Sequence, residues 1–274
     1  MSKTPPKDEM SFLDHLEELR WHLIRSVLAV VIIAVVAFLF KDFIFDVLLF
    51  GPKNKDFITY RWFCSISQTL GQGSSFCIEE LPFRIQSRTM AGQFSAHLWT
   101  SVIAGFILSF PYIIYEFWKF ISPGLYEKER KNARGFIFIA SILFFIGVLF
   151  GYYIVTPLSI NFLGNYSVST EIFNDFDLSS YIGLLRASVL ASGIIFELPI
   201  IIYFLTRIGV ITPEFLKKNR KISLVLVLSL SAIITPPDVV SQIIVSIPIL
   251  ILYEVSIIIA KIVKKNKEKA LQNV

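Results

Sequence analysis

Charged residues are missing from long stretches of this chain. Gly135–Thr170 contains no Asp, Glu, Lys, Arg or His, and Ala187–Leu205 contains Glu197 alone. The other runs without Asp, Glu, Lys or Arg are Ser26–Phe40, Phe94–Tyr115, Ile222–Pro237 and Val239–Tyr253. The chain is 54% hydrophobic and contains 26 Phe. No soluble domain of this size could bury so much apolar side chain, so the composition excludes one and indicates a membrane protein.

The apolar runs predict six membrane-spanning helices in an all-α fold, since a span needs about 20 apolar residues to cross roughly 30 Å of hydrocarbon. The predicted spans cover about residues 22–45, 94–118, 135–158, 182–206, 221–236 and 239–260. They form one transmembrane domain, residues 12–263, between cytoplasmic tails at 1–11 and 264–274. The charge-free parts of spans five and six are about 16 and 15 residues long and reach only about 24 Å, so we expect both spans to be short.

Basic residues are distributed unevenly between the two sides of this predicted topology. If the N-terminus is cytoplasmic, 19 of the 26 Lys and Arg residues lie on the cytoplasmic side. The second outside loop, Ser159–Tyr181, has three acidic residues and no basic one. The positive-inside rule therefore predicts both termini in the cytoplasm and a periplasmic loop at about residues 51–93. We attribute the net charge of +5 to this topology and to contact with anionic lipid, and not to nucleic-acid binding.

Patterns that mark enzymes are also missing. There is no glycine-rich phosphate loop, which excludes a nucleotide-driven motor within this chain. The three histidines do not make a metal site, because His15 and His22 are seven positions apart on one helix and His97 is expected across the bilayer. No Ser/His/Asp or Cys/His set recurs at one depth. The sequence predicts a protein that is not an enzyme and holds no metal or cofactor.

Cysteine is scarce: Cys64 and Cys77 are the only two, and both fall in the long outside loop. In an oxidising periplasm they could close a loop of about 14 residues, worth roughly 3 kcal/mol in the chain-entropy model. Two unpaired thiols are the alternative. A cleavable signal peptide is not expected, because Met1–Arg25 is polar, partly acidic and long.

Several polar residues interrupt the apolar segments. Glu197 lies in the middle of span four, where a carboxylate costs on the order of 3 kcal/mol, so it should face protein or water. Pro199 follows it and should bend the helix. Between spans five and six, Asp238 is expected to cap the next helix, and the amide of Gln242 should find a partner on another helix. Thr235 begins this turn.

Acidic side chains gather at the predicted cytoplasmic face. They are Asp14, Glu17 and Glu18, beside Arg20, on the first helix, and Glu127 and Glu129 in the connection after span two. Two carboxylates from different segments could hold two adjacent arginines, whose planar guanidinium groups accept bidentate pairing. The alternative is a solvated charged face, since exposed pairs contribute only about 0.2–1 kcal/mol each. An apolar segment bound beside the arginines would then supply most of the affinity.

Four motifs in order resemble the TatC family, the multi-spanning receptor subunit of the twin-arginine protein translocase. They are HLEELRWHL at His15–Leu23, FWKFISPGLYEKER at Phe117–Arg130, FELP at Phe196–Pro199 and TPPDVVSQ at Thr235–Gln242, and IPILILYE at Ile247–Glu254 fits the same pattern. The resemblance covers roughly residues 12–261, except most of the first outside loop. It implies a concave, glove-shaped bundle in the bacterial cytoplasmic (inner) membrane that exports folded proteins with the proton-motive force.

The resemblance also implies roles for individual residues. Glu18 and Glu129 fall where the family contacts the paired arginines of a signal peptide. The rest of that signal-peptide site would comprise Arg20, Phe120, Pro123, Leu125 and Tyr126. The polar positions implied for the membrane interior and for docking single-span TatA/TatB-type partners are Glu197, Thr235, Asp238 and Gln242. A homo-oligomeric receptor complex in contact with lipid is implied as well.

The sequence departs from the family at two places and leaves two other functions open. His22 stands where many members have an arginine, and the first outside loop is longer than expected. The main alternative function is a proton-coupled secondary transporter that uses Glu197 and Glu254 as relay acids, although no internal repeat supports it. A purely structural scaffold is the third.

Overall fold

The structure is a computed structural model that describes residues 12–69, 71, 77, 81–121 and 133–272. It is mostly helical, which confirms the all-α prediction, although two three-residue strands were not expected. The chain divides into two units, one drawn from Met1–Leu39 with Ser101–Ser141 and the other from Phe40–Thr100 with Ile142–Val274. Each unit is described by itself below.

The first unit holds α1 (Phe12–Leu39), most of α3 (Gly92–Ile121) and the start of α5 (Ala133–Phe150). Close packing of α1 on α3 depends on Gly105: a Cβ there would lie 2.6 Å from the carbonyl oxygen of Val30 and 2.9 Å from the Cβ of Ala34. Small residues such as Gly105 let the backbones of membrane helices approach closely. Near the C-terminal end of α3, the rings of Trp118 and Phe136 stack with centroids 4.6 Å apart.

Replacing Gly105 with alanine should therefore separate α1 from α3. The methyl group meets backbone atoms, which cannot rotate away, so we expect a loss of about 1–3 kcal/mol in the free energy of unfolding. Gly183 is the matched control, because a Cβ there has no neighbour within 4 Å and alanine is the better helix former. Unfolding in mixed detergent micelles would measure both variants. Equal stabilities of Gly105→Ala and Gly183→Ala would contradict the close packing.

Five helical segments among the described residues are long and apolar enough to cross a membrane. They are Leu16–Leu39, Gly92–Ile121, Gly135–Asn165, Leu178–Arg207 and Val239–Lys267. The third runs from α5 through the π-helical η4 (Gly151–Val155) into α6 (Thr156–Asn165). Many of their apolar side chains are exposed, as expected of surfaces that face lipid. The count of six spans stays a prediction.

The fourth segment is interrupted where the sequence predicts a bend. α7 (Leu178–Phe196) ends just before Glu197, and α8 (Leu198–Arg207) begins just after it, with Pro199 in its first turn. Proline lacks the N–H that would continue the helical hydrogen bonding, so the break occurs here. Pro111 is tolerated differently, since α3 continues through it.

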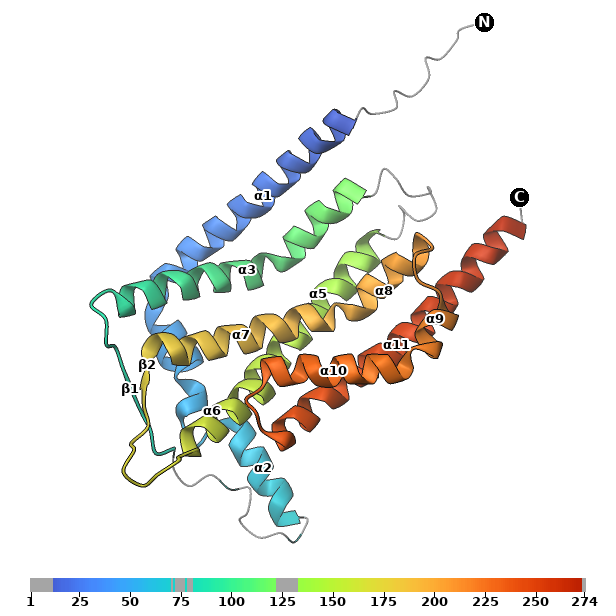
Figure 1. The fold of residues 1–274 in the computed structure, drawn as a ribbon. Coiled ribbons are helices and arrows are strands. Elements are labelled where there is room, and N and C mark those ends of the chain that lie inside the picture. The colour runs from blue at the N-terminus through green and yellow to red at the C-terminus, as the bar shows by residue number, and fades with distance from the viewer. Residues whose placement is uncertain (1–11, 70, 72–76, 78–80, 122–132, 273–274) are drawn as a thin grey trace, which may run out of the picture. The chain divides into compact units, whose positions relative to one another are not determined.

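The last two helices fold back beside one another (Figure 1). α10 (Arg220–Ile234) has only 15 residues, as expected of a short span. α11 (Val239–Gln272) has 34 residues, so the expectation that its helix would also be short is wrong. Glu254 ends the charge-free run but not the helix, because glutamate favours helices, and the lysines from Lys261 onward are stabilising near the C-terminus. α9 (Pro213–Lys218) joins α8 to α10, and the hydroxyl of Tyr253 donates to the carbonyl of Leu216 on α9 at 2.8 Å.

The segment between α1 and α3 has structure of its own. It contains η1 (Phe43–Leu49), η2 (Gly51–Lys53), α2 (Ile58–Thr69) and β1 (Arg84–Gln86). β1 pairs in parallel with β2 (Asp175–Asp177), just before α7. Cys64, in the middle of α2, and Cys77 form a disulfide that ties α2 to the chain beyond it.

Candidate functional site

A buried carboxylate lies near the C-terminal end of α3. Glu116 is 2% exposed, and its Oε2 lies 2.6 Å from Nδ1 of His22 on α1, which is itself 9% exposed. A buried charge is stable only when it is paired and hydrogen-bonded. The pair therefore links α1 to α3 across 94 positions of sequence.

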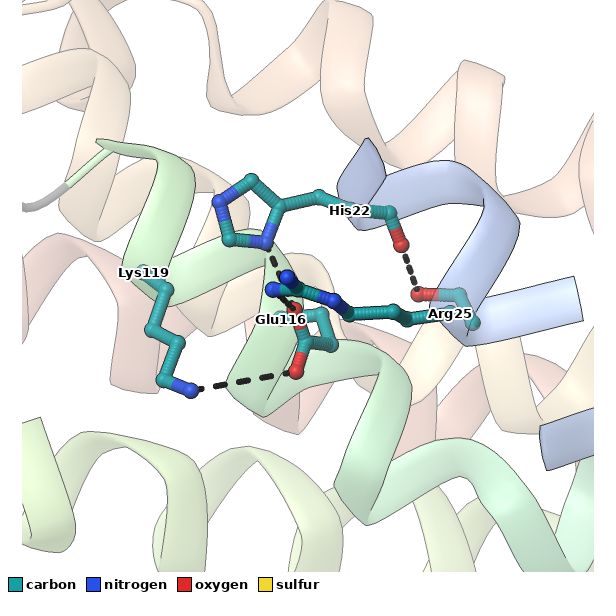
Figure 2. Close-up of polar contacts among 5 residues, drawn as sticks. His22, Arg25, Glu116 and Lys119 are labelled. Atoms are coloured by element: carbon teal, nitrogen blue, oxygen red, sulfur yellow. Dashed lines mark hydrogen bonds and ion pairs between the residues drawn. The ribbon is translucent and has the colours of Figure 1, made fainter. Parts of the chain in front are cut away.

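Two permanent cations complete this cluster, which we call the Glu116 cluster: His22, Arg25, Glu116 and Lys119. Arg25 places a guanidinium nitrogen 3.8 Å from Glu116, and Lys119 places its ammonium 3.9 Å away. Figure 2 shows the side chains from α1 and α3 converging on the one carboxylate. Lys119 also lies over the ring of Tyr115, 4.3 Å from its centroid. Because positive groups surround the single acid, Glu116 is compensated within the protein and is not free to hold a foreign cation.

Glu18 contrasts with Glu116. It lies one helical turn before His22 on α1, so the two side chains share a face of the helix. Its Oε2 is buried and has no hydrogen-bond partner among the described residues. A buried acceptor without a partner is costly, and such a group in a native structure calls for an explanation. A cation brought by a ligand would supply one.

Phe120, on α3, is a second predicted signal-peptide residue, and it lies near α1, the helix that carries Glu18. Its ring lies 6.2 Å from that of His22, edge to face, so the last turn of α3 is beside the turn of α1 that follows Glu18. Arg20 is exposed, and its guanidinium lies 5.5 Å from the centroid of the Trp21 ring. Because residues two apart on a helix point in different directions, Arg20 is not brought to Glu18. Pro123, Leu125, Tyr126 and Glu129 lie outside the described residues.

Neither Glu116 nor the structural role of His22 was predicted from the sequence. An acid at the end of an otherwise uncharged 22-residue run was a usable signal, since such residues seldom lie unpaired in a span. Its partner could not be identified in the same way, because nothing local connects positions 22 and 116.

The polar residues of the second unit fall into two groups. Glu197 is buried at the break between α7 and α8, and its Oε1 has no hydrogen-bond partner among the described residues. Glu254 is engaged instead, since Arg220 donates to it at 2.6 Å. Within the described part of the chain, no group of three His, Cys, Asp or Glu side chains could hold a metal ion.

The turn between α10 and α11 satisfies its polar side chains internally. Asp238 accepts hydrogen bonds from the backbone N–H and the hydroxyl of Ser241, at 2.8 and 2.6 Å, which confirms the predicted cap. Burial raises the pKa of Asp238, but these hydrogen bonds outweigh it and hold the pKa below its usual value. Gln242 donates to the carbonyl of Leu228 on α10 at 3.0 Å, so its expected partner on another helix is present. Thr235 donates to the carbonyl of Ser231 at 2.9 Å.

Comparison with known proteins gives one consistent result. Residues 14–248 match the family described as Sec-independent protein translocase protein (TatC). A protein of that name from Blattabacterium sp. subsp. Periplaneta americana is 48% identical over 262 residues, covering 95% of this chain and 98% of the relative. A protein of the same name from Aquifex aeolicus is 34% identical, and the match covers 95% of this chain and 98% of the relative.

The fold is also similar to solved structures. A crystal structure described as the twin arginine translocase receptor TatC is 33% identical, covers 91% of this chain and 99% of its own, and superposes with a TM-score of 0.67. None of these matches supports a small-molecule transporter. The chain belongs to the TatC family of Sec-independent protein translocase proteins.

Proposed function

We propose that this chain is the signal-peptide receptor and assembly core of a twin-arginine translocase. Family membership supports the general role, and the solved relative is described as a receptor. The observation that carries the specific proposal is Glu18, whose buried carboxylate oxygen has no partner among the described residues. A receptor for a cationic ligand needs a carboxylate that has no partner before the ligand binds, whereas a carboxylate with a structural role is already paired within the protein.

In this proposal the paired arginines of a signal peptide bind Glu18 and Glu129. Arginine suits this site better than lysine, because its planar guanidinium donates two parallel hydrogen bonds to one carboxylate. The Glu116 cluster sets the position of α1 against α3 without competing for the ligand, since its acid is already surrounded by cations. The apolar part of the signal then packs against apolar helix surface near Phe120, which adds about 0.8 kcal/mol per buried CH₂.

The proposed site for assembly with partner proteins lies in the membrane interior. Glu197 and the hairpin of α10 and α11 are the proposed docking region for single-span TatA/TatB-type partners. α10, at 15 residues, would reach only about 22 Å, which is less than the thickness of the hydrocarbon core. A short helix thins the bilayer around it or calls for a partner that covers it. The proposal places both termini in the cytoplasm, the protein in the bacterial inner membrane and the energy source in the proton-motive force, with several copies in the receptor complex.

Site-specific photocrosslinking tests the receptor role. A photoreactive residue at Ile121, next to Phe120, is presented with a precursor that carries either Arg-Arg or Lys-Lys in its signal. We expect a crosslink that requires Arg-Arg and is lost in Glu18→Ala. Glu17→Ala is the matched control, because Glu17 is the exposed neighbouring acid on the same helix. Equal crosslinking of both precursors, or equal loss in both variants, would favour a structural scaffold over a receptor.

A further inference from the structure

Arg186 is a charged residue that the proposed function does not use. It lies on α7 inside the apolar segment Leu178–Arg207, eight positions after its start. It makes no hydrogen bond or ion pair with any described residue. Charged side chains without partners are costly in membrane spans and are therefore usually functional.

The depth of Arg186 follows from helix geometry. A straight 30-residue helix would be about 45 Å long, and the bend at Glu197 shortens this segment, so at most about 7 Å of helix projects at each end of the roughly 30 Å hydrocarbon core. Arg186 is about 12 Å from the Leu178 end, which puts its backbone about 5 Å or more inside the hydrocarbon. A long arginine side chain can extend from that depth to the headgroups.

Arg186 also lines a cavity of about 240 Å³. The opposite wall comes from the first two turns of α3 and the residues before it, and includes Thr89, Gly92, Ser95 and Trp99. Of the described residues that line it, only Arg186 is charged. The cavity has about eight times the volume that one water molecule occupies in the liquid, enough for a phosphate group with its nearest atoms.

The chemistry of the lining favours an anion. Thr89 and Ser95 contribute hydroxyls, Trp99 contributes an indole N–H donor, and α3, a 30-residue helix, begins at Gly92. The N–H groups of Gly92 and Ser95 already donate to the carbonyls of Thr89 and Ala91, so the helix contributes mainly the partial positive charge of its N-terminus. This charge, the hydroxyls and the indole N–H add to the guanidinium of Arg186 on the opposite wall.

The acid nearest to this cavity along the chain is occupied elsewhere. Asp177 caps α7 and accepts hydrogen bonds from the backbone N–H of Ser179 at 2.8 Å and from that of Arg88 at 3.2 Å. The hydrogen bonds from Ser179 hold the pKa of Asp177 below its usual value, so it stays charged and satisfied. It does not line the cavity and does not neutralise Arg186.

Trp99 places the cavity at the level of the headgroups. It lies seven positions after the start of α3, at about 10 Å, and it is 57% exposed. Tryptophan is enriched at the membrane interface, where its ring is apolar and its N–H reaches polar groups. We propose that Arg186 and Trp99 form a site for the phosphate of a membrane phospholipid, held between the start of α3 and α7.

Native mass spectrometry of the purified protein tests this site. The protein in detergent is titrated with phosphatidylglycerol, with diacylglycerol of the same acyl chains, and with inorganic phosphate alone. Arg186→Gln should bind phosphatidylglycerol about five- to tenfold more weakly, since one arginine at the surface contributes about 1 kcal/mol or slightly more. Diacylglycerol binding should be unaffected by the substitution, because it lacks the phosphate.

Arg61→Gln is the matched control, because it removes an exposed arginine from α2, outside the cavity. Trp99→Phe keeps an aromatic ring and removes the N–H donor, so it should weaken phospholipid binding by a few fold even if Arg186→Gln fails to fold. Equal binding by Arg186→Gln, Arg61→Gln and the unmodified protein would overturn the proposal. So would displacement of the lipid by inorganic phosphate, which would show a site for an adventitious ion only.

Discussion

Replacing Glu18 with glutamine is expected to reduce export of a twin-arginine precursor by about ten- to hundredfold. A hydrogen bond to a charged group contributes about 1.5–3 kcal/mol, and glutamine keeps the shape of the side chain while removing the charge. The buried position of Oε2 makes the loss larger than at an exposed site, where an ion pair is worth no more than about 1 kcal/mol. Transport of a folded reporter into the periplasm, corrected for the amount of receptor in the membrane, measures the effect.

Glu17→Gln provides the comparison for this result. It removes the same charge one position earlier on α1, from a side chain that is exposed. Export by Glu17→Gln should stay within about twofold of the unmodified protein. If both variants lost export to the same extent, the general negative charge of the helix would be responsible, and the specific role of Glu18 would be refuted.

The second large effect is on stability. Replacing His22 with leucine should lower the free energy of unfolding by about 2–3 kcal/mol, because it leaves the buried Glu116 without its 2.6 Å partner. Arg25 and Lys119 remain, at 3.8 and 3.9 Å, so the loss should stay below that of a fully isolated buried charge. Unfolding in mixed detergent micelles gives the value.

A double-mutant cycle separates the pair from its surroundings. Glu116→Leu alone removes the buried charge, and the combination of His22→Leu with Glu116→Leu should recover part of the stability lost in His22→Leu, because no unpaired carboxylate remains. Arg25→Gln is the control, since it removes a half-exposed cation and should change stability by less than about 1 kcal/mol. Strict additivity of the two leucine substitutions would show that His22 and Glu116 do not interact.

Local sequence patterns predicted some contacts but not others. The cap at Asp238 follows from a short polar side chain just before a helix, and its partners lie only two and three positions away. The need of Gln242 for a partner was also predictable, whereas the identity of that partner, Leu228, required the fold of α10 against α11. The predicted shortness of span six failed because charge limits an apolar run and does not by itself end a helix.

The sequence by itself determined the class of this protein, because hydropathy and charge act through neighbouring residues and can be added along the chain. It determined the apolar helices, the break at Glu197 and the family motifs in the same way. Only the tertiary structure decided which polar groups have partners. The pairing of His22 with Glu116 and the position of Arg186 opposite Trp99 depend on how separate helices pack, and packing is set by contacts between residues far apart in sequence.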